Sequence, residues 1–396
     1  MVNRQSIVIV GASLAGIRCA EALRLNGFAG SIALIGAEPH APYDRPPLSK
    51  QILRHERVPA EIALLGAADL SRLDLRMCLG TEATALDLNR QIVTTTSGEF
   101  GFDALVIATG AVPRRLQMRH PADGVFYLRT LDDAIALGAR IVPEAKVVVI
   151  GGGFIGGEVA SSARARGARV TMLEASAGPL APILGSDIAG VCSELYRRHG
   201  IDLRCSVMAT GFLGEAEVSG VVLSDGQTVD ADVVAVGVGA KPATDWLGSS
   251  GLSLADGVVC DSICQAVGTD SVYAAGDVAR WEHPAFGSIR IEHWTNAVEQ
   301  ASAVADSILA PEQAQPYAPL PYFWSDQFDT KIQFAGVKSP AARFELVDGS
   351  IESGAFAGVY RVGNQVTGCV GFNRPRIVTS FRRQMLESFR DAAPAA

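Results

Sequence analysis

Apolar and polar residues alternate along this chain in short blocks that predict strands and helices in regular succession. Ser6–Val10 is an apolar run that ends at Gly11, which is typical of a buried parallel strand. Apolar residues across Leu14–Leu25 then follow a helical spacing that stops at an Asn-Gly pair. Residues 31–35 predict the next strand, so the chain opens with a strand–helix–strand unit.

The middle of the chain repeats this arrangement. Lys146–Ile150 predicts a strand, residues 151–157 a glycine-rich turn, residues 158–166 a helix and residues 169–173 the following strand. Two such units in one chain predict two dinucleotide-binding domains of the doubly wound α/β type.

Composition narrows the class of protein. A chain of 396 residues is too long for one hydrophobic core, and 48% hydrophobic with 19% charged residues is typical of a globular protein. No apolar run is long enough to predict a membrane span, and the short segment before the first strand leaves no room for a signal peptide. We therefore expect a cytoplasmic protein that binds no membrane.

The net charge of −8 argues against a general nucleic-acid binder. Residues 331–396 nevertheless carry nine Lys and Arg against five Asp and Glu, a net charge of +4, which leaves −12 on the rest of the chain. A basic C-terminal region indicates either an acidic partner or a solvated surface.

The first glycine-rich turn contains Gly11, Ser13, Ala15 and Gly16. Gly11 permits a tight turn and Gly16 lets the helix pack closely on the sheet, so that helix amides face a pyrophosphate. Ser13 stands where the middle glycine usually lies. Glu38 follows at the distance expected of a carboxylate that accepts hydrogen bonds from a ribose diol.

The second turn is a complete G-x-G-x-x-G, with Gly151, Gly153 and Gly156 between strand and helix. Glu174 ends the following strand, where its charge would repel a 2′-phosphate, and no Arg occurs in the next four residues. This pattern favours NADH over NADPH.

Two dinucleotide sites require two dinucleotides, and a flavin with a nicotinamide is the obvious pair. Apolar strands in residues 104–110, 232–239 and 272–275 each open into glycine, as expected where the chain passes a nucleotide. The last is followed by Gly276 and Asp277, and an Asp at such a turn can bond the ribityl chain of FAD. The first domain therefore resumes after the second.

Residues 42–50, PYDRPPLSK, resemble the signature of the NADH-dependent ferredoxin reductases of oxygenase systems, the relatives of putidaredoxin reductase and of biphenyl-type dioxygenase reductases. Further stretches carry the resemblance over nearly the whole chain: ALVIATG (104–110), FYLRTLDDA (126–134), GGGFIGGEVA (151–160), VYAAGDVAR (272–280), IEHWTNAVEQA (291–301) and YFWSDQFDTKIQFAG (322–336).

The resemblance implies two nested Rossmann-like domains of the glutathione-reductase type plus a C-terminal α+β domain. Its boundaries would be residues 1–112 and 242–312 for FAD, 113–241 for NADH and 313–396 for the C-terminal domain. Residues 311–321 are rich in Pro, Gln and Ala and predict a linker.

The resemblance also implies roles for individual residues. Lys50, on the first turn of a helix begun by Pro46 and Pro47, would point at the flavin N5 edge and pair with Glu158. The FAD-binding residues would be Gly11, Ser13, Ala15, Gly16, Glu38, Arg45, Lys50, Ala83, Thr109, Gly110, Arg129, Gly276, Asp277, Glu292, Trp294 and Trp324. The NAD-binding residues would be Gly151, Gly153, Ile155, Gly156, Glu158, Glu174, Gly237 and Gly239.

The implied activity carries electrons from NADH through FAD to a [2Fe–2S] ferredoxin that serves a cytochrome P450 or a ring-hydroxylating oxygenase. An acidic ferredoxin could dock on the basic C-terminal region, with Arg374, Arg376, Arg382 and Arg383 as candidates. Two alternatives stay open: an NADH oxidase or other NADH-dependent flavin reductase, and an NADH-sensing flavoprotein that resembles apoptosis-inducing factor.

Cysteine and histidine positions exclude other chemistry. The seven cysteines include no C-x-x-C pair and none between Cys19 and Cys78, so a redox thiol beside the flavin is not expected. The six histidines have no metal-ligand spacing, and we predict no metal.

Overall fold

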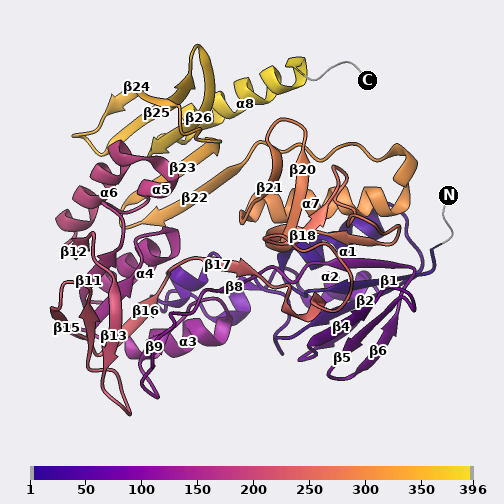
Figure 1. Ribbon diagram of the computed structural model, residues 1–396, viewed down its shortest axis with the longest axis horizontal. Coiled ribbons are helices and arrows are strands. Elements are labelled where there is room, and N and C mark those ends of the chain that lie inside the picture. Colours follow the sequence, from indigo (N-terminus) through magenta and orange to yellow (C-terminus); the bar gives the residue numbers. More distant parts are fainter. Residues whose placement is uncertain (1–3, 393–396) are drawn as a thin grey trace. The chain divides into compact units, whose positions relative to one another are not determined.

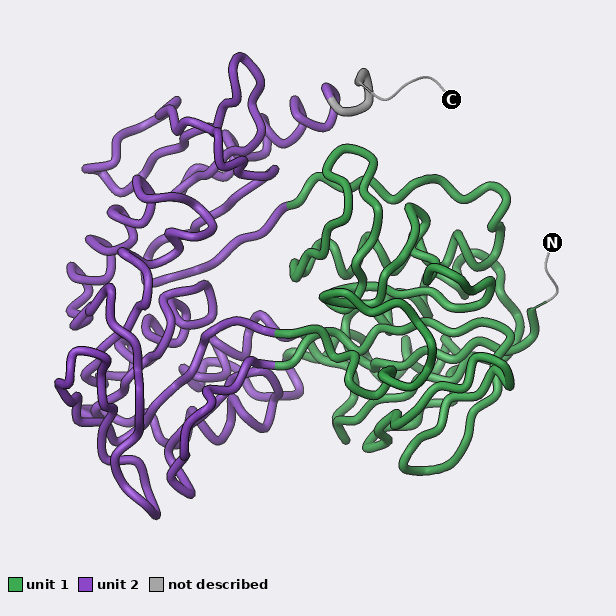
Figure 2. The backbone as a smooth tube through the Cα atoms, in the orientation of Figure 1, with its two compact units in different colours: residues 1–44, 62–112, 241–321 green, residues 45–61, 113–240, 322–396 purple. Residues whose placement is uncertain are grey.

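The computed structural model describes residues 4–392 and divides the chain into two compact units, each built from three separate segments (Figure 2). Unit 1 comprises residues 1–44, 62–112 and 241–321, and unit 2 comprises residues 45–61, 113–240 and 322–396. Unit 2 thus groups most of the predicted nicotinamide domain with most of the predicted C-terminal domain. The three-domain boundaries stay a prediction.

Unit 1 is built on a five-stranded parallel sheet with the strand order β19-β7-β1-β2-β3. Its strands are β1 (Ser6–Val10), β2 (Ser31–Gly36), β3 (Leu75–Leu79), β7 (Ala104–Ile107) and β19 (Val272–Ala274). Helix α1 (Leu14–Leu25) packs against α7 (Trp294–Leu309). The predicted first strand–helix–strand unit is confirmed, and so is the return of the chain to this sheet after the second unit.

Smaller elements complete unit 1. Two three-stranded sheets have the orders β4-β5-β6 and β18-β20-β21. Their strands are β4 (Ala83–Asp87), β5 (Ile92–Thr95), β6 (Gly98–Gly101), β18 (Val258–Cys260), β20 (Ala279–His283) and β21 (Gly287–Arg290). The short helices are α2 (Ala67–Arg72) and the 3₁₀ turns η3 (Asp245–Leu247), η4 (Gly276–Val278) and η5 (Pro311–Gln313), with η2 (Pro59–Ile62) at the boundary with unit 2.

The predicted linker is more ordered than its composition suggested. Tyr317 is buried, and its amide donates to the Ser262 carbonyl oxygen at 2.7 Å. The Trp281 indole donates to the Tyr317 carbonyl oxygen at 3.0 Å. Apart from the short turn η5, the segment has no helix or strand, as its Pro-rich composition predicted, but composition could not predict that the aromatic side chain of Tyr317 anchors it in unit 1.

Unit 2 contains a second parallel sheet with the order β12-β11-β10-β16-β9. Its strands are β9 (Val125–Phe126), β10 (Lys146–Ile150), β11 (Arg169–Glu174), β12 (Asp202–Cys205) and β16 (Val233–Val236). Its helices are α3 (Leu131–Arg140), α4 (Phe154–Ala165), α5 (Ala181–Leu184) and α6 (Ser186–Arg198), and β13 (Ala209–Leu213), β14 (Gly220–Leu223) and β15 (Thr228–Asp230) form a small sheet. Helix α4 begins at Phe154 rather than at residue 158, because Gly153 is already its N-cap.

The C-terminal part of unit 2 is an antiparallel sheet with the order β22-β23-β26-β25-β24, followed by helix α8 (Pro375–Ala392) (Figure 1). Its strands are β22 (Tyr322–Gln327), β23 (Thr330–Gly336), β24 (Arg343–Ser350), β25 (Ala355–Val362) and β26 (Gln365–Phe372). The predicted α+β character is confirmed. Strands β8 (Ala111–Pro113) and β17 (Ala240–Pro242), where the chain passes from one unit to the other and back, pair with each other.

One apolar cluster joins the C-terminal sheet to the nucleotide-binding part of unit 2. Leu184, Ile188 and Cys192 from α5 and α6 pack with Phe334 and Phe356 from the sheet, and all five are buried. The Tyr360 hydroxyl also donates to the Leu184 carbonyl oxygen at 2.6 Å. Truncating one of the large side chains to Ala would cost about 3–5 kcal/mol.

Candidate functional site

The first glycine turn of unit 1 joins β1 to α1 in the geometry that a pyrophosphate requires. Gly11 has φ +121°, and a Cβ there would lie 2.1 Å from the Ala108 carbonyl oxygen. A Cβ at Gly16 would lie 1.8 Å from the Gly11 carbonyl oxygen. Glycine at both positions is therefore needed for the turn itself, and α1 begins directly after this turn, with Ser13 in the N-cap position but without a side-chain capping hydrogen bond.

The second glycine turn, in unit 2, has the same construction. Gly151 has φ +105°, with the Gly237 carbonyl oxygen 2.3 Å from a Cβ built there, and a Cβ at Gly156 would lie 2.0 Å from the Gly151 carbonyl oxygen. A Cβ at Gly153 would meet nothing within 4 Å. The middle glycine therefore leaves open space above the start of α4, where no side chain caps the helix. This space fits a dinucleotide phosphate.

Each turn has a carboxylate nearby, held in a different way. In unit 2 the Glu174 carboxylate accepts the Gly152 amide at 2.7 Å and the Ser176 amide at 2.6 Å, one on each oxygen. In unit 1 the Glu38 carboxylate accepts the Tyr43 hydroxyl. The two backbone hydrogen bonds fix the direction of Glu174 at the end of β11, the position from which it can bond a ribose diol.

A third segment of unit 1 carries the Gly276–Asp277 turn. Gly276 has φ +78°, and its amide donates to the buried Gln300 side chain at 2.8 Å. Arg290 donates to the Asp277 carbonyl oxygen at 3.0 Å and forms an ion pair with Glu292 at 2.7 Å. Glu292 thus contacts the arginine that binds the Asp277 turn, and the FAD-binding roles predicted for Gly276, Asp277 and Glu292 stay predictions.

Other predicted flavin residues of unit 1 make contacts within that unit. Thr109 donates through its hydroxyl to the Ala243 carbonyl oxygen at 2.8 Å, and Gly110 has φ +71°. The Trp294 indole donates to the Asp44 carboxylate at 2.8 Å. A Cβ at Gly276 would lie 3.1 Å from the Ala15 Cβ, so the first glycine turn and the Gly276 turn adjoin. Ala83 begins β4 and packs against the core of unit 1.

Lys50 and Glu158 meet inside unit 2. The Lys50 ammonium lies 2.9 Å from the Glu158 carboxylate, and the side chains are only 8% and 5% exposed. The expected helix after Pro46 and Pro47 is a π-helix, Leu48–Ile52. This wider turn brings Ser49 onto the same carboxylate as Lys50, at 2.5 Å. Short π-helical segments often occur at functional sites.

Arg45 and Arg129 lie together in unit 2, where Arg45 donates to the Arg129 carbonyl oxygen. Ile155, in the first turn of α4, is 47% exposed. Gly237 and Gly239 follow β16, and the Gly239 carbonyl oxygen accepts the Arg114 amide at 2.9 Å. Trp324 lies in β22, with its ring stacked beside that of Tyr322. The binding roles predicted for all these residues stay predictions.

Comparison with known proteins identifies the family. The family model described as pyridine nucleotide-disulphide oxidoreductase matches residues 5–301, and the model described as reductase C-terminal matches residues 322–396. The chain belongs to this oxidoreductase family. It is a flavoprotein that uses FAD and NAD(H), as the two glycine turns predicted.

Individual relatives align over nearly their whole lengths. The ferredoxin–NAD(+) reductase component of the p-cumate 2,3-dioxygenase system of Pseudomonas putida is 37% identical and covers 95% of this chain and 92% of its own. A rubredoxin–NAD(+) reductase of Pseudomonas putida is 36% identical over 84% of this chain and 86% of its own. The solved structure of a covalent putidaredoxin reductase–putidaredoxin complex matches with a TM-score of 0.91 and 31% identity, covering 96% of this chain and 92% of that chain.

The name of the family includes disulphide chemistry, and the cysteines of this chain are not arranged for it. All seven are free thiols, and burial raises the pKa of Cys19, Cys192, Cys264 and Cys369 to about 12. Burial also raises the pKa of Cys260 well above its usual value. Since the thiolate is the reactive form, these thiols are poor nucleophiles.

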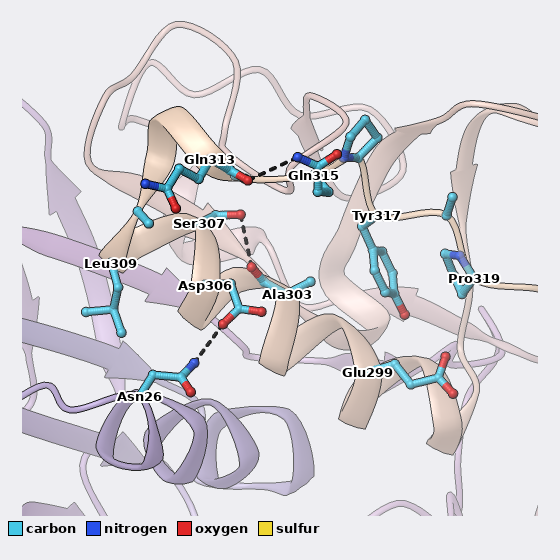
Figure 3. Close-up of a pocket in the computed structure, with 14 residues that line it drawn as sticks. Asn26, Glu299, Ala303, Asp306, Ser307, Leu309, Gln313, Gln315, Tyr317 and Pro319 are labelled. Atoms are coloured by element: carbon cyan, nitrogen blue, oxygen red, sulfur yellow. Dashed lines mark hydrogen bonds between the residues drawn. The ribbon is translucent and has the colours of Figure 1, made fainter. Parts of the chain in front are cut away.

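Unit 1 also has an open hollow of about 690 Å³ at the far end of α1 from the glycine turn (Figure 3). Asn26, which follows α1, donates to Asp306 of α7 at 2.7 Å across it, and Tyr317 lines its other side. No residue predicted to bind a cofactor lines this hollow.

Within residues 4–392 no cluster of His, Cys, Asp and Glu has the arrangement of a metal site. No described helix is long and apolar enough to cross a membrane.

Sequence reasoning missed three residues that touch the predicted sites: Ser49, Ser325 and Gln300. Ser49 and Ser325 bind Glu158, and Gln300 holds the Gly276 amide. Each stands inside a stretch that carries the family resemblance. That position was the only available signal, because none belongs to a glycine turn or has a charge.

Proposed function

We propose that this protein carries electrons from NADH through FAD to a [2Fe–2S] ferredoxin that serves a cytochrome P450 or a ring-hydroxylating oxygenase. The observation that carries the proposal is a pair of glycine turns, one in each unit, each with a carboxylate, in a chain that aligns end to end with reductases of ferredoxins. Bound FAD would accept a hydride from NADH and release electrons one at a time, which is the chemistry of the cofactor rather than of the protein.

The residues of the chain bind and orient the two dinucleotides. In unit 1 the amides after Gly11 and the Asp277 turn would hold FAD, and in unit 2 the amides after Gly153 and the Glu174 carboxylate would hold NADH. Lys50 and Glu158 would supply a fixed pair of charges at the flavin. Burial excludes water from this pair, so its electrostatic effect is larger than that of an exposed pair.

Docking of an acidic ferredoxin on the basic C-terminal region needs arginines that are available to a partner. Arg374 is held by Asp348 at 2.7 Å, and the Arg382 guanidinium lies over the Tyr322 ring at 4.9 Å. Arg376 is exposed, and Arg383 is 74% exposed with Glu387 3.9 Å away. We therefore propose Arg376 and Arg383 as the stronger docking candidates among the four predicted arginines.

The decisive experiment is reduction of cytochrome c by NADH with a panel of small carriers as intermediates. We expect fast turnover with at least one [2Fe–2S] ferredoxin and slow turnover with oxygen or cytochrome c alone. Fast turnover with a rubredoxin, and with no ferredoxin, would make rubredoxin the electron acceptor in place of ferredoxin. The similarity to a rubredoxin reductase that is 36% identical supports this second candidate. Fast turnover with no carrier would favour an NADH oxidase. Slow turnover throughout, with a long-lived flavin–NAD⁺ charge-transfer band, would favour an NADH sensor.

The same assay tests docking. The double variant Arg376→Glu and Arg383→Glu should lower the apparent association rate with an acidic ferredoxin about tenfold at low salt and flatten its salt dependence. The matched control is Arg90→Glu with Arg119→Glu, which makes the same charge change at exposed positions elsewhere. Equal effects of the two double variants would contradict docking at α8.

We also propose that the protein works in the cytoplasm. Its seven free thiols suit a reducing compartment, and NADH is supplied there.

A further inference from the structure

The Glu158 carboxylate is surrounded by donors that come from two separate parts of unit 2. On one oxygen it accepts the Ser49 hydroxyl at 2.5 Å and the Lys50 ammonium at 2.9 Å. On the other it accepts the Ser325 hydroxyl at 2.8 Å, with the Asp326 amide at 3.4 Å. Ser325 and Asp326 belong to β22, so the C-terminal sheet supplies half of the hydrogen bonds to this carboxylate.

Ser325 is itself held by a chain of hydrogen bonds that runs in one direction. The Tyr196 hydroxyl of α6 donates to the Gln327 side-chain oxygen at 2.7 Å. The Gln327 side-chain nitrogen donates to the Ser325 oxygen at 3.1 Å. Because the Ser325 oxygen accepts this hydrogen bond, its own hydroxyl hydrogen donates to the Glu158 carboxylate. Ser325, Gln327 and Tyr196 are each 0% exposed, so water does not replace any of these bonds.

The two segments that bind the Glu158 carboxylate are each tied to helix α4 by a further hydrogen bond. The Ser162 hydroxyl of α4 donates to the Ser49 carbonyl oxygen at 2.7 Å, which ties the π-helix to the helix that carries Glu158. The Phe328 amide, just after β22, donates to the Ser161 hydroxyl at 2.6 Å. Glu158 therefore lies between two segments that are both anchored to α4, and its position depends on both.

We propose that Ser325 is a positioning residue that orients Glu158, and through Glu158 orients the Lys50 ammonium, for hydride transfer from NADH to the flavin. The inference rests on the proposed role of Lys50 and Glu158. Without the Ser325 hydroxyl, one carboxylate oxygen keeps only the Asp326 amide at 3.4 Å. The carboxylate can then rotate, and the ammonium bound to its other oxygen rotates with it. The C-terminal domain thus contributes to the reductive half-reaction and not only to partner binding.

The test is stopped-flow reduction of the flavin by NADH in the full-length holoenzyme, without any ferredoxin. We expect Ser325→Ala to lower the limiting rate about tenfold, the usual scale for one hydrogen bond to a charged group, with the NADH dissociation constant within about twofold of the parent. Tyr196→Phe, which keeps the ring and removes one hydroxyl, should lower the rate about twofold to threefold. Ser193→Ala is the control, because the buried Ser193 hydroxyl donates to the Ala189 carbonyl oxygen of its own helix and makes no bond to Glu158.

A double-mutant cycle with Glu158→Gln shows whether Ser325 acts through Glu158. Ser325→Ala should have almost no effect on the rate once Glu158 is Gln, because the partner that it positions has lost its charge. An equal effect of Ser325→Ala in both backgrounds would overturn the inference, as would a parental rate for Ser325→Ala. If Glu158→Gln alone has the parental rate, the result contradicts the proposed role of the Lys50–Glu158 pair, on which the inference about Ser325 rests. Flavin reduction by NADH can be measured without a ferredoxin, so a failure to reduce ferredoxin would contradict the proposed function without affecting this test.

If Ser325→Ala loses its flavin, Tyr196→Phe in the same cycle decides the question. A parental rate for Tyr196→Phe, or a loss that is the same with Gln at position 158, would then overturn the inference.

Discussion

The β1–α1–β2 segment of unit 1 and the β10–α4–β11 segment of unit 2 build the same kind of turn, and they differ in the middle residue of that turn and in the groups that hold the nearby carboxylate. In both, a glycine with positive φ ends the first strand, and a second glycine lies against its carbonyl oxygen. The middle position is Ser13 in one and Gly153 in the other. The carboxylate is Glu38, held by a tyrosine, in one and Glu174, held by two amides, in the other.

This difference separates what makes the turn from what selects the ligand. The close approaches at Gly11 and Gly16, and those at Gly151 and Gly156, are backbone contacts that any dinucleotide would require. The middle residue meets no backbone atom in unit 2, and the two carboxylates are held by different groups, so these features can set the ligand rather than the path of the turn. We expect substitutions at these turn glycines to have the largest effects on binding, and substitutions of the middle residue or the carboxylate to have smaller effects on affinity or on the choice of cofactor.

The largest effect is expected from Gly11→Ala and Gly151→Ala. Each places a methyl group against a backbone carbonyl oxygen at a φ that only glycine adopts easily, so the turn must move. Gly11→Ala should yield protein that is purified without flavin. Gly151→Ala should keep the flavin and weaken NADH binding about 100-fold, as measured by titration of the oxidised enzyme with NAD⁺.

The control is Gly190→Ala in α6, where a Cβ meets nothing within 4 Å. Flavin loss in Gly151→Ala, or a normal flavin content in Gly11→Ala, would break the assignment of one dinucleotide to each unit.

A smaller effect is expected from the double variant Glu174→Ser and Ala175→Arg. Removing the carboxylate ends the repulsion of a 2′-phosphate, and the arginine attracts it. The ratio of kcat/KM for NADPH to that for NADH should rise about 100-fold. Part of the change will be a loss for NADH, because the Gly152 and Ser176 amides lose their acceptor. Glu38→Gln in unit 1 should leave the ratio unchanged.

The smallest effects are expected from exchanging the middle residues. Gly153→Ser fills open space above α4 without a clash, so the fold should be unchanged while NADH affinity falls about tenfold. Ser13→Gly should change flavin affinity by less than about threefold. Flavin affinity is measured by fluorescence titration of the apoprotein with FAD, and nucleotide affinity by titration of the holoenzyme with NAD⁺. A larger loss from Ser13→Gly than from Gly153→Ser would reverse the expected order.

Most of the fold could be predicted from the sequence because strand, glycine turn and helix follow one another within a few residues. Leu14–Leu25 is a helix with the predicted bounds, and both β1 and β10 occur where the apolar runs predicted them. The contacts that complete the sites could not be predicted in this way. Ser49 and Ser325 are more than 270 residues apart, and nothing local in either segment indicates that both bind Glu158.

The π-helix at Leu48–Ile52 illustrates the same limit. Pro46 and Pro47 correctly predicted a helical start, yet the wider turn depends on where Ser49 and Lys50 must point. That direction is set by Glu158, on a helix about a hundred residues further along the chain. Contacts between residues far apart in the sequence decide such local geometry, and these contacts cannot be predicted from the local pattern of a single sequence.

The discontinuous path of the chain has a consequence for synthesis on the ribosome. Strand β7 pairs with β1 early, but its other neighbour, β19, is made only after about 160 further residues, and α7, which packs on α1, is made later still. Until then one edge of the nascent sheet offers unpaired amides and carbonyls, and the apolar face of α1 lacks its cover. Closing such a long loop is slow, so the nascent chain exposes apolar surface and an unpaired strand edge for a long time. We expect chaperones to bind it during that interval.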